Sequence, residues 1–82
     1  MWDALISTSA RRFIDGLSPS ERGEWEDALW AFLSRPLPGD AVELGFPYPP
    51  GTFGYSTDKF WFTFTVINSQ TLGIAGVMYA PS

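Results

Sequence analysis

The chain has 82 residues, of which 5 are basic and 9 acidic, giving a net charge of −4. This length allows one hydrophobic core, so we expect a single domain spanning residues 1–82. Because the sequence contains no His and no Cys, it excludes imidazole and thiolate chemistry, the usual zinc sites and disulfide bonds, and its acidic balance argues against binding of free nucleic acid.

The composition also predicts a location. No basic and apolar leader opens the chain, and Thr63 and Thr65 interrupt its longest apolar stretch. Neither an export signal nor a membrane span is therefore indicated. Together with the lack of cysteine, this favours a cytoplasmic protein that makes no contact with membranes.

The first predicted elements are a short strand and a helix. Residues 1–8 hold Trp2, Leu5 and Ile6 in a stretch too short for a helix to pack well, which favours a strand. Ser9 can cap a helix, because apolar residues follow it at spacings of three and four. These residues are Ala10, Phe13, Ile14 and Leu17.

A second helix has the clearest start signal. Residues 18–21 place a serine at the N-cap, a proline at the first helical position and a glutamate that can return a hydrogen bond, which is a capping box. Pro36 and Pro38 forbid continuation of the helix, so we expect its end near Arg35. Its apolar stripe comprises Trp25, Ala28, Leu29, Phe32 and Leu33.

Residues 36–54 hold most of the prolines and several glycines. This composition predicts an ordered loop, anchored by the rings of Phe46, Tyr48 and Phe53. A short strand can form within it, around residues 41–44.

From Tyr55 onward the hydrophobic period changes to two, which indicates strands. Residues 60–67 are expected to form a central strand, residues 68–70 a hairpin loop and residues 72–79 a last strand. A three-residue loop gathers the apolar side chains on one face. The predicted pairs are Val66 with Leu72, Phe64 with Ile74, Phe62 with Gly76, and Phe60 with Met78.

The opposite face of this sheet is the predicted binding surface. In the expected register it carries Trp61, Thr63, Thr65 and Tyr79, together with Ala75 and Val77. An exposed aromatic pair beside small and hydroxylated residues suits a protein partner. Burial of Trp61 and Tyr79 under the 36–54 loop is an alternative of equal weight.

The charged residues offer little for catalysis. The carboxylates between Glu21 and Asp27 lie on the polar side of the second helix near its N-terminal half, where the helix dipole favours negative charge. A solvated helix face is therefore expected there, and neither a metal site nor a cofactor site. Lys59 follows Asp58 at an expected surface turn, which does not suit a Ser-Lys catalytic pair.

The order of strand, helical hairpin, loop and three-stranded antiparallel sheet resembles the RelE/ParE superfamily of small bacterial toxins. The segments that carry the likeness are SARRFIDGLS (9–18), AFLSRP (31–36), ELG (43–45) and KFWFTFTV (59–66). The resemblance implies an α+β fold in which a short N-terminal strand and a helical hairpin precede that sheet.

The resemblance also implies two modes of action. RelE-like members cut messenger RNA on the ribosome with basic and aromatic side chains on the sheet. Trp61 stands where these proteins often have arginine, and Tyr79 is the one candidate catalytic residue that this sequence retains. ParE-like members instead block DNA gyrase by protein contact, and members of both kinds are neutralised by an antitoxin.

Two functions are therefore in competition. The first is a toxin-like component of a type II toxin–antitoxin module that acts mainly by protein binding, on the ribosome or DNA gyrase, without the electrostatic donors that standard mRNA cleavage requires. The second is a non-enzymatic interaction module that uses Trp61, Thr63, Thr65 and Tyr79. A homodimer formed through an edge strand or the aromatic face is a third arrangement.

Overall fold

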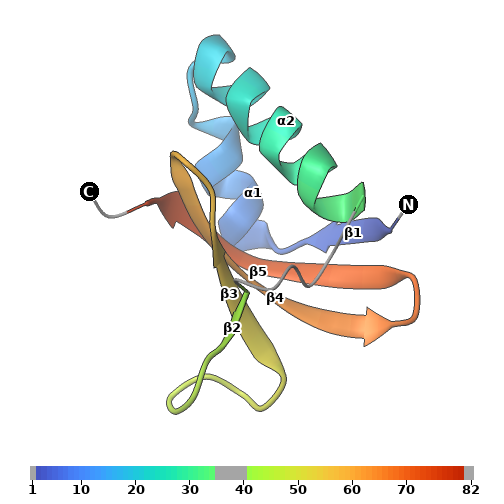
Figure 1. Cartoon of the computed structure of the whole chain (residues 1–82). Coiled ribbons are helices and arrows are strands. Elements are labelled where there is room, and N and C mark those ends of the chain that lie inside the picture. Colours follow the sequence, from blue (N-terminus) through green and yellow to red (C-terminus); the bar gives the residue numbers. More distant parts are fainter. Residues whose placement is uncertain (1, 35–40, 81–82) are drawn as a thin grey trace.

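The computed structural model describes residues 2–34 and 41–80. These residues form an α+β domain, as predicted, with both helices lying across one face of a single sheet (Figure 1). The strands are arranged in the order β1-β5-β4-β3-β2. The elements are β1 (Asp3–Ile6), α1 (Thr8–Asp15), α2 (Pro19–Ser34), β2 (Val42–Glu43), β3 (Thr52–Ser56), β4 (Phe60–Asn68) and β5 (Thr71–Tyr79).

The sheet is mixed, whereas the sequence predicted three antiparallel strands. The predicted N-terminal strand is present as β1, but it joins the same sheet, parallel to β5, with Asp3 opposite Thr71 and Ile6 opposite Ile74. β2 adds a short antiparallel edge beside β3. A parallel pair between the two ends of a chain leaves no local signal in the sequence, so this pairing could not be predicted from turns.

The starts of α1 and α2 can be compared with the two predicted helix caps. Helix α1 is capped by Ser7 and not by Ser9, because the Ser7 hydroxyl accepts a hydrogen bond from the Ala10 amide at 3.1 Å and donates one to the Ala75 carbonyl at 2.6 Å. The capping box of α2 is confirmed. The Glu21 amide donates to the Ser18 hydroxyl at 3.2 Å, and the Ser18 amide donates to the Glu21 carboxylate at 3.4 Å.

The 36–54 segment differs from its prediction in two respects. Residues 35–40, which include the expected helix end near Arg35, lie outside the described residues. The short strand predicted near residues 41–44 is present as β2. Strand β3 begins at Thr52, so the last three residues of the expected loop are strand. Of the three rings expected to anchor the loop, Phe53 packs against the core, but Phe46 and Tyr48 are exposed.

The hydrophobic core lies between the helices and the sheet. Its largest side chains meet edge to face: the Trp25 and Phe62 ring centroids are 5.6 Å apart, and those of Phe32 and Phe62 are 4.9 Å apart. The apolar stripe predicted for α2 faces this core. The buried residues are Ala10, Ile14, Leu17, Trp25, Phe32, Leu33, Phe60, Phe62, Phe64, Leu72, Ile74 and Val77.

The β4–β5 hairpin follows the predicted register only near its turn. The predicted pairs of Val66 with Leu72 and of Phe64 with Ile74 are confirmed. The loop is tighter than expected, because Asn68 already pairs with Thr71 and Ile67 is left out of the register. Beyond Ile74 a β-bulge at Ala75 shifts the pairing by one residue, so the two remaining predicted pairs are wrong. The observed pairs are Phe62 with Val77 and Phe60 with Tyr79.

Candidate functional site

The sheet face turned away from the helices carries three of the four predicted binding residues. Trp61, Thr63 and Thr65 alternate along β4 with the buried phenylalanines, so their side chains point to the side that no described helix covers (Figure 1). We call this surface the outer face. Its exposed strand residues include Leu5, Val42, Ile67 and Met78, while Trp61, Thr63 and Thr65 are partly exposed.

Glycines shape the outer face. The indole of Trp61 lies flat over Gly54 of β3, where a Cβ would overlap the ring atoms Cη2 and Cζ2. The end of Ile67 lies over Gly73 in a similar way. Large side chains that lie along the sheet in this manner cover the backbone and make the surface flat and apolar.

A hollow interrupts this flat surface. It has a volume of about 280 Å³ and lies where β1 meets β5. Its floor includes Gly73 and the bulge residue Ala75. Leu5, Ser7 and Thr65 stand around it.

Tyr79 does not lie on the outer face. The prediction that it forms an exposed aromatic pair with Trp61 on this face is therefore wrong. The bulge at Ala75 exchanges the faces of the residues that follow it, so Val77 and Tyr79 point toward the helices and Met78 takes the place beside Trp61. The Tyr79 ring packs edge to face on Phe13 of α1 at 5.1 Å and stacks on Phe60 at 6.0 Å.

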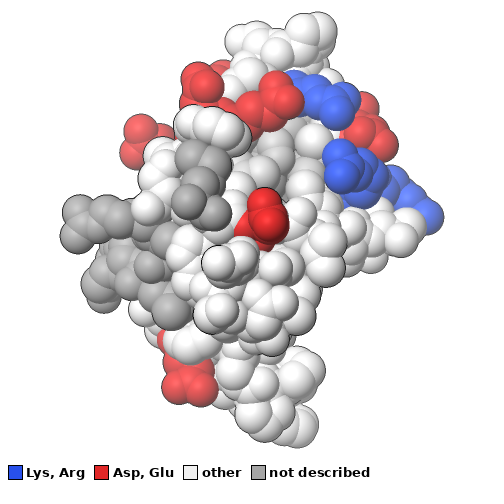
Figure 2. Space-filling model, turned by 90° about the vertical axis from the view of Figure 1, so that its right-hand side faces the viewer, with Lys and Arg blue, Asp and Glu red and all other residues white. Residues whose placement is uncertain are grey.

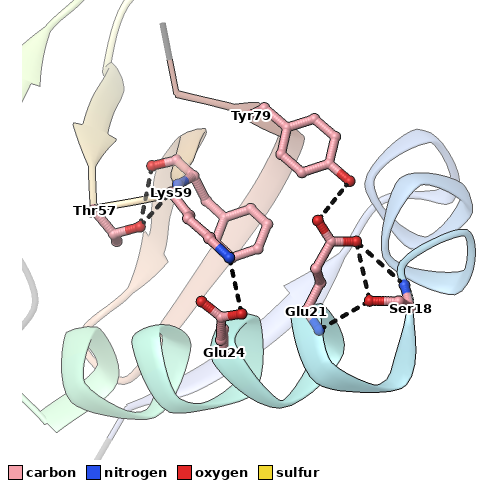
Figure 3. A network of polar contacts seen from close by, with 7 residues as sticks. Ser18, Glu21, Glu24, Thr57, Lys59 and Tyr79 are labelled. Carbon is pink, nitrogen blue, oxygen red and sulfur yellow. Dashed lines mark hydrogen bonds and ion pairs between the residues drawn. The ribbon is translucent and has the colours of Figure 1, made fainter. Parts of the chain in front are cut away.

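The Tyr79 hydroxyl belongs to a polar network at the start of α2 (Figure 3). It donates to Glu21 Oε2 at 3.2 Å, while Glu21 Oε1 accepts from the Ser18 hydroxyl at 3.2 Å. Beside this cluster, Lys59 Nζ donates to Glu24 Oε1 at 3.0 Å. The network joins the turn between β3 and β4 and the end of β5 to the first two turns of α2.

The contacts within this network shift the pKa values of three of its side chains. The hydrogen bond from the Ser18 backbone amide lowers the pKa of Glu21, and the hydroxyls of Ser18 and Tyr79 act in the same direction. Desolvation, followed by the charge of Glu21, raises the pKa of Tyr79. The hydrogen bond to Glu24 raises the pKa of Lys59. At neutral pH the phenol is therefore neutral and the lysine charged, so neither can accept a proton from a substrate.

The described strands contain no Lys or Arg. Apart from their tyrosines, the only ionisable residues in them are Asp3 and Glu43. Figure 2 shows the Lys and Arg side chains in the upper half of the molecule, at the height of the helices, while the surface below is nearly uncharged. Arg22 of α2 pairs with Asp15 at 3.7 Å. No phosphate group crossing the outer face would thus meet a basic side chain from the strands beneath it.

Across residues 2–34 and 41–80, no three acidic side chains converge as a metal ion would require. In the same residues, no helix has the length and apolar character needed to cross a membrane.

Sequence reasoning missed Gly54 and Met78 as parts of the outer face. Gly54 had a signal, since a glycine inside an alternating strand often marks a close approach, but the role of Met78 depends on a bulge with no signal.

Comparison with known proteins identifies the fold. No protein-family model matches the sequence, and no curated protein matches it significantly. A chain of the toxin–antitoxin complex RelBE2 from Mycobacterium tuberculosis superposes with a TM-score of 0.79 at 20% identity, covering 96% of this chain and 98% of that one. The isolated RelE toxin of E. coli gives a TM-score of 0.75 at 14% identity, over 100% of this chain and 87% of the toxin.

This chain has the RelE-like toxin fold. A chain of the intact RelBE toxin–antitoxin complex of E. coli agrees, with a TM-score of 0.73 at 13% identity and complete coverage of both chains. The predicted resemblance is therefore confirmed for the architecture, which persists although few residues are shared. On this RelE-like fold, the described strands present aromatic, hydroxylated and small side chains without Lys or Arg.

Proposed function

We propose that this chain is the toxin-like component of a type II toxin–antitoxin module and acts mainly by binding a protein. The observation that carries the proposal is the superposition of this chain on 87% of the RelE toxin, combined with described strands that contain no basic residue. The superposition favours a toxin role. The missing positive charge argues against cleavage of messenger RNA, because a phosphate transition state depends on electrostatic donors, each worth on the order of 3 kcal/mol.

The position of Tyr79 argues in the same direction. Its ring packs on Phe13 and Phe60 and its hydroxyl is held by Glu21, so it is directed away from the outer face. Target binding, to the ribosome or to DNA gyrase, needs no catalytic group and is compatible with the acidic chain. Such targets require a cytoplasmic location, which the sequence also predicts.

An antitoxin partner belongs to the same proposal. Two of the superposed chains come from toxin–antitoxin complexes. The exposed apolar residues of the outer face, among them Leu5, Ile67 and Met78, offer a surface that a helix or strand of an antitoxin can cover.

The test is growth of a bacterial host after tight induction of the chain, with soluble expression confirmed in the same samples. We expect growth arrest while ribosome-bound messenger RNA stays intact. Unaffected growth with abundant soluble protein would contradict the toxin role. Messenger RNA cleavage that is lost in Tyr79→Phe would contradict the binding mode and support a nuclease.

A second function, a non-enzymatic interaction module, is favoured by one specific observation. The outer face exposes Met78 at 55% beside Trp61 and, further along the sheet beside Gly73, Leu5 at 60% and Ile67 at 52%. A Met78→Lys variant places a charge beside Trp61 on this face without disturbing the core. If the outer face binds a partner, including a second copy of the chain, the variant should abolish the complex in light scattering or pulldown. An unchanged complex would exclude this face.

A further inference from the structure

The loop that joins β2 to β3 exposes two aromatic rings at once. This 44–51 loop has the sequence LGFPYPPG. Phe46 is 100% exposed and Tyr48 is 46% exposed. The loop lies at the far end of the β2–β3 arm, away from both helices (Figure 1).

These rings do not stabilise the described fold. Phe53 and Tyr55 of the neighbouring strand pack against the core, whereas Phe46 is fully exposed and Tyr48 is about half exposed. The described backbone hydrogen bonds of the loop stay within the β2–β3 arm. The Tyr48 amide donates to the Gly45 carbonyl at 3.0 Å, and the Leu44 amide donates to the Thr52 carbonyl at 2.8 Å.

The loop is nevertheless restricted in conformation. Three of its eight residues are prolines, whose rings fix the backbone angle φ. Gly51 closes the loop with φ at 82°, in the left-handed region that glycine adopts without strain. A restricted loop loses less conformational entropy on binding than a flexible one, so its exposed rings can contribute more to affinity.

The charges around the loop select the class of partner. No basic residue occurs between residues 41 and 58, and the acid Glu43 directly precedes the loop. A nucleic acid or an anionic lipid surface would find no attraction here, because both depend on Lys or Arg. The remaining class of partner is a protein with a cleft lined by apolar and aromatic side chains. Clefts of this kind bind proline-rich segments in other proteins.

We propose that the 44–51 loop is the element that contacts the target protein, with Phe46 and Tyr48 entering an apolar cleft on its surface. This inference rests on the proposed function for the biological role of the target. It is distinct from the outer face, which is left free for an antitoxin. A hollow of about 380 Å³ beside the rings, lined by Glu43, Leu44 and Gly45 among others, gives a side chain of the target a place to enter.

The first test compares the wild-type chain with the double variant Phe46→Ala/Tyr48→Ala in the growth assay. The matched control is Trp30→Ala, which removes an aromatic side chain that is 64% exposed on α2. Both variants should melt within about 4 °C of the wild type, because exposed substitutions have small effects on stability. We expect the double variant to lose growth arrest and the control to keep it. Arrest by the double variant at equal expression would overturn the proposal.

A second measurement separates failure of the loop from failure of the toxin role. If the wild-type chain does not arrest growth, the toxin role fails, and the loop is tested by placing the photocrosslinker p-benzoylphenylalanine at position 46 or, as a control, at position 30. We expect a discrete crosslinked protein from position 46 only, joined through an apolar residue. Wild-type chain added before irradiation should suppress formation of this product at a concentration roughly 30-fold lower than the double variant, as for an interface hot spot.

Three outcomes would overturn the inference in that arm. They are the absence of a discrete product, equal competition by both chains, and crosslinking to nucleic acid or lipid in place of protein.

Discussion

The close approach of Trp61 to Gly54 leads to a prediction about stability. On the outer face the indole ring lies directly over the Gly54 backbone, and a Cβ at that position would overlap two ring atoms. The ring is rigid and Gly54 is buried between strands, so neither side can yield without a shift of backbone or rotamer. Gly54→Ala should therefore destabilise the domain.

Two opposing effects set the magnitude. Alanine restricts the unfolded chain and would by itself stabilise the protein by about 0.4–1 kcal/mol. Overpacking against the ring should cost about 1–3 kcal/mol. The net loss should be on the order of 1–2 kcal/mol, which corresponds to about 5–15 °C in the melting temperature of a domain of this size.

The assay is thermal and urea unfolding of a double-mutant cycle. In the Trp61→Ala background, Gly54→Ala should lose its penalty, so the two sites should couple by about 1–3 kcal/mol. Gly76→Ala is the matched control, because its Cβ would meet only the Thr63 hydroxyl at an ordinary 3.5 Å. If Gly54→Ala and Gly76→Ala behave alike, the ring does not lie where the structure has it, and the description of a flat outer face is refuted.

The remaining predictions concern the core and the polar network. Phe62→Ala should lower the free energy of unfolding by about 3–5 kcal/mol, measured in urea, because its ring is fully buried; a loss below about 1 kcal/mol would contradict its central position. Tyr79→Phe keeps both ring contacts and should shift the melting temperature by less than about 4 °C, whereas a large shift would show that the Glu21 contact is essential to folding. The lowered pKa of Glu21 stabilises the fold at pH above its unfolded value of about 4.3, and this contribution is lost as the pH falls through the lower folded value. Glu21→Gln should therefore reduce the fall in melting temperature between about pH 5 and pH 3, and an unchanged fall would contradict this linkage.

The helical half of the fold was accessible from the sequence because its signals are local. The capping box at Ser18 and the apolar stripe of α2 act within a few residues, and both are present as predicted. The start of α1 shows the limit of such signals. Ser7 and Ser9 are both serines that could cap α1. Ser7 is the N-cap in the structure, where its hydroxyl also donates a hydrogen bond to Ala75 of a strand distant in sequence.

The candidate surface was predicted correctly on β4 and incorrectly on β5. Alternation alone places Trp61, Thr63 and Thr65 away from the core, since β4 keeps a period of two through these residues. The same rule fails after Ala75, because one extra residue inverts the faces of all that follow. The small residues of β5 pack acceptably in either register, so the hydrophobic pattern could not reveal the bulge, and Tyr79 was assigned to the wrong side.

The parallel pairing of β1 with β5 has a consequence for synthesis of the protein. β1 is hydrogen-bonded in the sheet only to β5, and α1 packs against that same last strand. A nascent chain can form its helical hairpin early, but the first strand has no neighbour until the final one leaves the ribosome. Ends that are far apart in sequence must then meet, which is a slow type of contact. Any toxic action of this fold would therefore begin only after β5 has left the ribosome.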